Sequence, residues 1–157
     1  MSAGRGDGSG VGWVVAQVPL CALALLAPRI GPRWPRGLAR PGRVAGASLL
    51  AAGAFLVARG AIDLGPNLTM LPKPRDGATL VQDGVYGVVR HPIYAGVVLG
   101  ALGWSLLTAN TTRLLLAGAL LAFFDAKARY EEARLLARFP EYARYREAVA
   151  RLLPGLY

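Results

Sequence analysis

The sequence has a single cysteine, Cys21, and a single histidine, His91, among its 157 residues. One cysteine forms no intramolecular disulfide, and together with one histidine it is too small a ligand set for a cysteine cluster or a zinc site. Acidic residues are also scarce, since nine Asp and Glu stand against 18 Lys and Arg, a formal net charge of +9. The sequence therefore predicts a basic protein without a metal centre.

Apolar residues, by contrast, are abundant: they make up 54% of the chain and give it a mean hydropathy of +0.39. That composition is too apolar for an ordinary soluble domain and predicts an integral membrane protein. The positive charge lies between the apolar runs, where it can set the topology and contact anionic lipid headgroups. Because no nucleic-acid recognition fold is visible, we expect the membrane, and not nucleic acid, as the partner of this charge.

Apolar runs at residues 11–27 and 44–62 predict two transmembrane helices, since a bilayer is crossed by about 20 apolar residues. The Arg- and Pro-rich segment 28–43 between them is expected to be a loop outside the membrane. Residues 1–10 can bury little apolar surface, so we expect them to be disordered. The first unit, residues 11–62, is thus a pair of helices joined by a basic loop.

The second unit, residues 63–157, begins with a polar, Pro-rich loop that we expect to make a short extended excursion around residues 83–84. Shorter apolar runs at 93–107 and 114–124 predict a helical hairpin, which either tilts or continues its second helix into the charged tail. Apolar residues at helical spacing predict that this tail is amphipathic, lies on the membrane surface and breaks near Pro140. The predicted fold class is therefore all-α, an integral membrane protein of about four transmembrane helices with a C-terminal hairpin and an amphipathic cytoplasmic tail.

The orientation is predicted from the distribution of Lys and Arg. Four crossings put the N-terminus, the loop after residue 62 and the tail on one side, with eleven Lys and Arg against six on the other. The positive-inside rule then places the tail and the candidate site in the cytoplasm, as in a multi-pass protein of a bacterial inner membrane. The five Arg concentrated in residues 28–43 indicate the opposite orientation, and the two indications conflict.

The segment "RHPIYAG", Arg90–Gly96, carries the histidine at the start of an apolar run. Pro92 biases His91 away from helical geometry and suits a helix start, so His91 is expected at the membrane interface. Two adjacent carboxylates, Glu131 and Glu132, follow on the extension of the last helix. An imidazole and backbone N–H groups at a helix N-terminus suit an anion, whereas carboxylates suit an ammonium or hydroxyl groups.

The combination "RHPxYxG", a hairpin, "EE" and "FPEYxxYRxxVxRLxP" resembles the isoprenylcysteine carboxyl methyltransferase family and its phospholipid N-methyltransferase relatives, over residues 62–154. The resemblance implies methyl transfer from S-adenosylmethionine in a pocket built from the last helices and the tail, without a soluble Rossmann-type domain. Carried over by position, it implies that the cofactor is bound by His91, Tyr94, Gly96, Glu131, Glu132, Tyr142 and Tyr145. Of the two carboxylates, Glu132 is favoured as the ligand.

Three cations, Arg59, Arg90 and Lys127, are candidates for orienting an anionic group of the substrate. For Arg59 a local ion pair with Asp63, four residues on, is the alternative, and Arg90 could instead bind lipid phosphate. Many family members have Arg where Lys127 stands, and an ammonium is not equivalent to a guanidinium as a carboxylate clamp.

The resemblance leaves the lipophilic acceptor open: a prenylated protein C-terminus, a free isoprenoid acid, a phospholipid amine or another nucleophile. We expect its apolar chain to enter between the second span and the 93–107 helix along Gly96, Gly100 and Gly103, with close helix packing as the alternative.

Two other functions stay open. One is a non-enzymatic membrane protein. The other is an NADPH-dependent membrane reductase of the sterol-reductase type, whose related "RHPNYxGE" differs here at Ile93 and Val97. Each candidate residue also has a structural alternative: His91 as a helix cap, the two Glu as a solvated helix face, and the tyrosines as interfacial residues.

Overall fold

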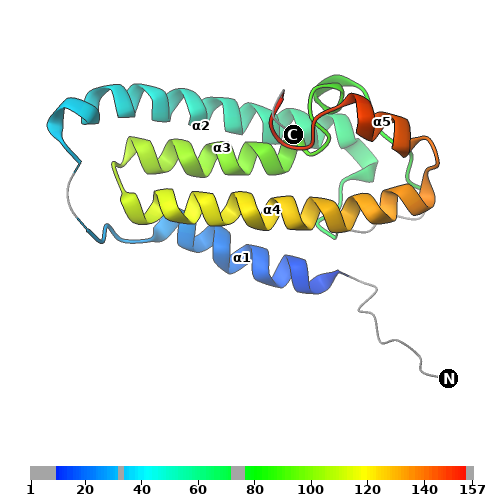
Figure 1. The fold of residues 1–157 in the computed structure, drawn as a ribbon, viewed down its shortest axis with the longest axis horizontal. Helices are drawn as coiled ribbons and strands as arrows, with labels where there is room; N and C mark the ends of the chain where they lie inside the picture. Colours follow the sequence, from blue (N-terminus) through cyan, green and yellow to red (C-terminus); the bar gives the residue numbers. More distant parts are fainter. Residues whose placement is uncertain (1–9, 32–33, 72–76, 155–157) are drawn as a thin grey trace.

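The computed structural model describes residues 10–31, 34–71 and 77–154, and in it the chain forms a bundle of helices (Figure 1). The elements are α1 (Val11–Leu26), α2 (Arg36–Leu64), η1 (Gly65–Asn67), η2 (Gly84–Gly87), α3 (Pro92–Leu107), α4 (Thr111–Arg138) and α5 (Tyr142–Ala148), where η marks a 3-10 turn. The predicted all-α class is confirmed. The disorder predicted for residues 1–10 concerns residues that, except for Gly10, lie outside this description.

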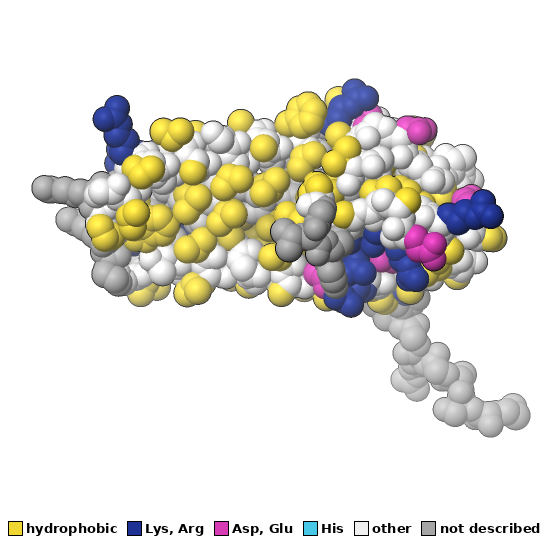
Figure 2. Space-filling model, turned by 45° about the horizontal axis from the view of Figure 1, so that its top comes forward, with side chains coloured by type: hydrophobic (Ala, Val, Ile, Leu, Met, Phe, Trp, Pro, Cys, Tyr) yellow, Lys and Arg dark blue, Asp and Glu magenta, His cyan; other side chains and the backbone are white. Residues whose placement is uncertain are grey.

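In the part of the chain that the structure describes, one helical stretch is long and apolar enough to cross a bilayer, Arg40–Asn67. The apolar helices α1 and α3 are shorter, at 16 residues each. The number of crossings therefore stays a prediction. Large apolar side chains nevertheless face outward, among them Val15 (65% exposed), Phe55 (61%) and Leu115 (71%). Figure 2 shows such side chains along the bundle and most of the charged ones near one end, as a lipid-facing surface requires.

The helices lie side by side in the order α2, α3, α4, α1, with α2 antiparallel to α3 and α5 across the end where α4 finishes (Figure 1). Glycines bring α2 and α3 together backbone to backbone. A Cβ added to Gly96 would lie 2.6 Å from the carbonyl oxygen of Gly53, and one added to Gly103 would lie 2.6 Å from that of Gly46. The expected entry of an acceptor chain along Gly96 and Gly103 is therefore wrong, because backbone of α2 occupies that face.

Helix α2 also corrects the predicted loop at residues 28–43, since it begins at Arg36 and contains Pro41. Three of the four prolines of that segment precede the helix, and Pro41 lies only two turns from its start, where it removes a single backbone hydrogen bond. The remaining Ala, Leu and Arg residues favour helix. The prediction from the number of prolines therefore made the loop too long, since residues 36–43 belong to α2.

Two other expectations concern the second unit. The extended excursion around residues 83–84 is wrong beyond Asp83, because Gly84 has a φ of 62° and begins the turn η2. The Asp63 carboxylate accepts a hydrogen bond from the Val85 backbone N–H at 3.0 Å and so ties this turn to α2. The hairpin of α3 and α4 is confirmed, with α4 continuing into the tail to Arg138, and the break near Pro140 is confirmed as well.

Helix α1 is fixed against α4 near both of its ends. The Asn110 side chain donates to the Ala27 carbonyl at 3.2 Å, and Arg113 Nε donates to the same oxygen at 3.0 Å. At the other end the Trp13 ring packs edge-on against Phe123, with centroids 5.4 Å apart. This placement brings the middle of α1 to the end of the bundle at which α3 begins.

Candidate active site

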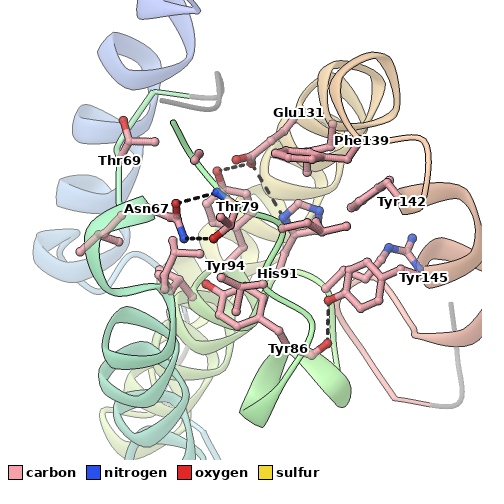
Figure 3. Close-up of a pocket in the computed structure, with 18 of the residues that line it drawn as sticks. Asn67, Thr69, Thr79, Tyr86, His91, Tyr94, Glu131, Phe139, Tyr142 and Tyr145 are labelled. Carbon is pink, nitrogen blue, oxygen red and sulfur yellow. Dashed lines mark hydrogen bonds and ion pairs between the residues drawn. The ribbon is translucent and has the colours of Figure 1, made fainter. Parts of the chain in front are cut away.

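A cavity of 290 Å³ lies at the end of the bundle where α3 begins, between α1, α3, α4, α5 and the segment that follows α2 (Figure 3). Seven of the predicted site residues line it: Arg90, His91, Tyr94, Lys127, Glu131, Tyr142 and Tyr145. Three others, Arg59, Gly96 and Glu132, do not line it. The fold thus brings the "RHPxYxG" segment and the tail to one place.

His91 is held at the N-terminus of α3 by the backbone of the C-terminal tail. It is the N-cap residue, and Pro92 begins the helix, as predicted. The backbone N–H groups of Arg90 and His91 donate to the carbonyls of Ala150 and Arg151 at 2.8 and 3.1 Å. The tail therefore straps the histidine segment in place, a role that the sequence did not predict.

Glu132 lies behind the cavity as the centre of a charged cluster. Its Oε1 accepts hydrogen bonds from Arg90 Nε at 2.9 Å, His91 Nε2 at 3.2 Å and Arg151 Nε at 3.2 Å. The side chain is only 4% exposed. Burial alone raises the pKa of Glu132, but the hydrogen bonds from His91 and Arg90 outweigh it and lower the pKa to about 2. Because the ionised carboxylate only accepts, His91 donates through Nε2.

Glu131, the adjacent carboxylate, faces the cavity instead. Its Oε2 accepts a hydrogen bond from the Tyr94 hydroxyl at 2.9 Å and lies 3.8 Å from His91 Nδ1. The side chain is 22% exposed. The Tyr94 ring in turn stacks on that of His91, with centroids 5.3 Å apart and planes within 2°. Of the two carboxylates, Glu131 is therefore the one with an oxygen available to a bound molecule.

Lys127 presents a buried ammonium to the same cavity. The residue is 2% exposed, and Nζ donates to Gln17 Oε1 at 2.5 Å and lies 3.5 Å from the Met70 carbonyl. Nζ also lies 5.1 Å from the centroid of the Tyr94 ring. Burial lowers the pKa of Lys127, against the opposing effect of the Glu131 charge. Among the described residues no carboxylate lies within ion-pair distance of Lys127, so this cation can accept an anionic group.

The predicted cations Arg90 and Arg59 are engaged within the protein. Beyond its bond to Glu132, Arg90 donates through Nη1 to the carbonyls of Arg146 and Val149, so it joins α3 to the tail. Arg59 is paired with Asp63 at 2.8 Å on the outside of α2, which is the local ion pair that the spacing predicts.

Other cavity residues were missed from the sequence. Gln17 comes from α1, and Asn67 and Thr79 come from the two sides of the loop after α2. The Thr79 backbone N–H donates to Asn67 Oδ1 at 3.2 Å, which closes that wall of the cavity. No periodicity marks these positions. Asn67 and Thr79 lie within the range of the resemblance, residues 62–154, but outside the motifs that carry it.

A second cavity of 310 Å³ lies farther along the same helices and is apolar. It is lined by Cys21, Ala24, Leu25, Leu50, Val97, Gly100, Ala101, Trp104 and Leu120. Apart from Leu50 of α2, these residues lie about one to three turns from Gln17, Tyr94 and Lys127 on α1, α3 and α4. A Cβ added to Gly100 would meet only Leu50 Cδ1, at 3.9 Å. The structure therefore places an apolar cavity next to the polar one.

Comparison with known proteins identifies a family to which the chain is similar. A family model described as phospholipid methyltransferase matches residues 42–141, more than half of the chain. The matched range contains the histidine segment, the α3–α4 hairpin and both adjacent carboxylates.

Two curated proteins are similar to part of the chain. A protein-S-isoprenylcysteine O-methyltransferase from Schizosaccharomyces pombe is 40% identical over 77 residues, which cover 48% of this chain and 33% of that protein. A cobalt-zinc-cadmium resistance protein, CzcN, from Cupriavidus metallidurans is 39% identical over 85 residues, which cover 52% of this chain and 38% of that protein. The matched part of the chain thus spans 33% and 38% of the length of these two relatives.

Proposed function

Because this chain belongs to the phospholipid methyltransferase family, we propose that it is a membrane enzyme that transfers a methyl group from S-adenosylmethionine to a lipophilic acceptor, such as an isoprenoid carboxylate. The observation that carries the proposal is the cavity that Glu131, His91 and Lys127 share. The similarity to an isoprenylcysteine O-methyltransferase supports an oxygen nucleophile.

The groups around the cavity fit the polar groups of the methyl donor. Glu131 would pair with its ammonium, while the backbone N–H groups at the start of α3, beside His91, would face its carboxylate. Tyr94, Tyr142 and Tyr145 would complete the walls. Bound S-adenosylmethionine would supply a methyl group that its positive sulfonium already activates.

The chain's own residues would then position the acceptor. Lys127 would orient the acceptor carboxylate, whose oxygen attacks the methyl carbon while the C–S bond breaks and its electron pair passes to sulfur. A carboxylate needs no proton removed, so no general base is required, and positioning can lower the barrier by about 7–11 kcal/mol. The acceptor's apolar chain would occupy the second cavity, on the other side of Lys127 and Tyr94.

Residues that are engaged within the protein would support this arrangement. Glu132 and Arg90 would fix His91 and the tail, and Arg59 would hold Asp63, which ties down η2. Gly96 would support the site indirectly, because the absence of a side chain there lets α3 pack closely against α2. We propose residues 63–157 as the catalytic unit, completed by Gln17 of α1.

We expect S-adenosylhomocysteine to raise the melting temperature of the purified protein in detergent, and NADPH to leave it unchanged. A ligand that binds only the folded state at 100 times its Kd adds about 2.7 kcal/mol to stability, which a thermal-shift assay detects. A shift with NADPH alone would favour a reductase. No shift with either compound, in a preparation shown to be folded, would favour a non-enzymatic protein.

We also expect the tail and the loop after α2 to face the cytoplasm of a bacterial cell, because the methyl donor is made there. Ala143 is exposed on α5. In a Cys21→Ala background, a cysteine placed at Ala143 should react in intact cells with a membrane-permeant thiol reagent and not with an impermeant one. Labelling by the impermeant reagent would reverse the orientation.

A further inference from the structure

Helix α1 is apolar except for one strongly polar side chain, Gln17. Among the residues Val11–Leu26 it is the only one that is charged or that has an amide or hydroxyl side chain. A polar side chain in such an apolar helix is costly within a membrane and indicates a functional contact. Gln17 also lies outside residues 42–141, which the family model matches, so membership of the family does not account for it.

Gln17 connects the polar cavity to the buried ammonium of Lys127. Its Oε1 accepts a hydrogen bond from Lys127 Nζ at 2.5 Å, and both residues line the 290 Å³ cavity. An ammonium only donates, so the amide oxygen must face Lys127 and the amide nitrogen must face away from it.

The amide nitrogen of Gln17 is available to a bound molecule. Within the described ranges, Gln17 Nε2 makes no hydrogen bond. In the same part of the chain, the one buried side-chain polar atom without a partner is the Tyr142 hydroxyl, so Gln17 Nε2 is not buried. The amide therefore offers two N–H groups at the wall of the cavity.

The charge behind this amide is positive. Lys127 is 2% exposed, and among the described residues its ammonium has neutral partners, the Gln17 amide and the Met70 carbonyl. A hydrogen bond from a cation to the amide oxygen polarises the amide and strengthens its N–H groups as donors. Glu131, the carboxylate that lines the same cavity, is bonded to the Tyr94 hydroxyl instead. Gln17 and Lys127 together therefore suit an anionic group and not an amine.

Gln17 lies where the two cavities approach each other. On α1, Cys21 is one helical turn from Gln17 and lines the apolar cavity of 310 Å³. On α3, Val97 lines the apolar cavity and Tyr94, about one turn before it, lines the polar one. A molecule whose apolar chain fills the second cavity therefore presents its polar group beside Gln17.

We propose that Gln17 Nε2 donates a hydrogen bond to a carboxylate of the acceptor, with the Lys127 ammonium behind the amide supplying the positive charge. The assignment rests on the proposed function and narrows its acceptor to a lipophilic carboxylic acid. N–H donors backed by a cation select an anionic oxygen group against an amine. A carboxylate held through one oxygen keeps the other free to attack the methyl carbon.

The substitution Gln17→Glu separates this role from a structural one. Glutamate keeps an oxygen for Lys127 Nζ, and so keeps α1 attached to α4, but it has no N–H and neutralises the cation. The variant should melt at or above the wild-type temperature and bind S-adenosylhomocysteine with unchanged affinity. It should bind farnesoic acid, an isoprenoid carboxylic acid, about tenfold or more weakly, because it loses a hydrogen bond to a charged group.

Gln17→Met is the matched control, because it has a similar length and no hydrogen-bonding group that can replace the amide. It leaves the buried ammonium of Lys127 without its amide partner, so its melting temperature should fall below that of the wild type. A purely structural role of Gln17 predicts that Gln17→Met loses farnesoic acid binding and that Gln17→Glu retains it.

The test measures melting and the binding of three probes to the full chain in detergent: S-adenosylhomocysteine, farnesoic acid and farnesylamine, which has the same apolar chain and an amine. The wild type should bind the acid about tenfold or more tightly than the amine. No binding of farnesoic acid by the wild type, a preference for the amine, or equal binding of the acid by wild type and Gln17→Glu would each overturn the assignment, as would a loss of S-adenosylhomocysteine binding in Gln17→Glu. A wild type that bound no S-adenosylhomocysteine would refute the proposed function, whereas normal S-adenosylhomocysteine binding beside acid binding that ignores residue 17 would overturn only this inference.

Discussion

Gly100→Leu is expected to leave the protein folded and able to bind S-adenosylhomocysteine, yet to reduce methyl transfer to a lipid acceptor about a hundredfold or more. Gly100 lines the apolar cavity, and a Cβ there meets only Leu50 Cδ1 at 3.9 Å, so a larger side chain has room. That side chain would fill the space proposed for the acceptor's chain. A displacement of about 1 Å at a reacting centre can already cost about a hundredfold in rate.

The measurement is the incorporation of a radiolabelled methyl group into organic-extractable material from a lipid extract, for wild type and variant side by side. Gly103→Leu is the matched control, one turn farther along α3. A Cβ on Gly103 would lie 2.6 Å from both the Gly46 carbonyl and the Leu50 nitrogen, so this variant should fail to fold. Undiminished transfer by Gly100→Leu would contradict the placement of the chain, and label confined to a water-soluble product would exclude a lipophilic acceptor.

Helix boundaries could be predicted from the sequence, but the environment of each glycine in α3 could not. His91 stands at the start of α3 because Pro92 fixes that boundary locally, and the break of the tail at Pro140 has an equally local cause. The three glycines of α3 look alike in the sequence. Only the packing of α2 shows that Gly96 and Gly103 meet backbone while Gly100 opens onto a cavity.

Contacts between residues that are far apart in the sequence could not be predicted from the sequence. Gln17 contacts Lys127 across 110 positions, and the pairing of Arg90 with the tail spans more than 50. Such contacts depend on how α1 and α5 dock, which no local propensity encodes. Among the described residues the Tyr142 hydroxyl has no hydrogen-bond partner, whereas the Tyr145 hydroxyl donates to the Tyr86 carbonyl, and this difference is likewise a property of the packed state.

The choice between Glu131 and Glu132 is the point at which the sequence was least informative. Neighbours on a helix point about 100° apart, so two adjacent carboxylates start in different directions, and the sequence does not show which of them faces the cavity. The resemblance favoured Glu132 as the ligand of the cofactor. In the structure Glu131 lines the cavity, and Glu132 is turned toward Arg90, His91 and Arg151. We therefore expect the two substitutions to act on different properties.

Glu131→Gln should weaken binding of S-adenosylhomocysteine about 10- to 150-fold with little change in stability, because it removes a charge-assisted bond of about 1.5–3 kcal/mol to the ligand's ammonium. Glu132→Gln should instead destabilise the protein by about 3–5 kcal/mol, because the buried Arg90 guanidinium loses its carboxylate partner, whereas Arg151 keeps Asp125. Calorimetric binding and thermal unfolding of both variants separate the two effects. A Glu132→Gln protein that melted normally and lost the ligand, beside a Glu131→Gln protein that bound it, would show that Glu132 contacts the cofactor, and Glu131 would then serve only to hold Tyr94.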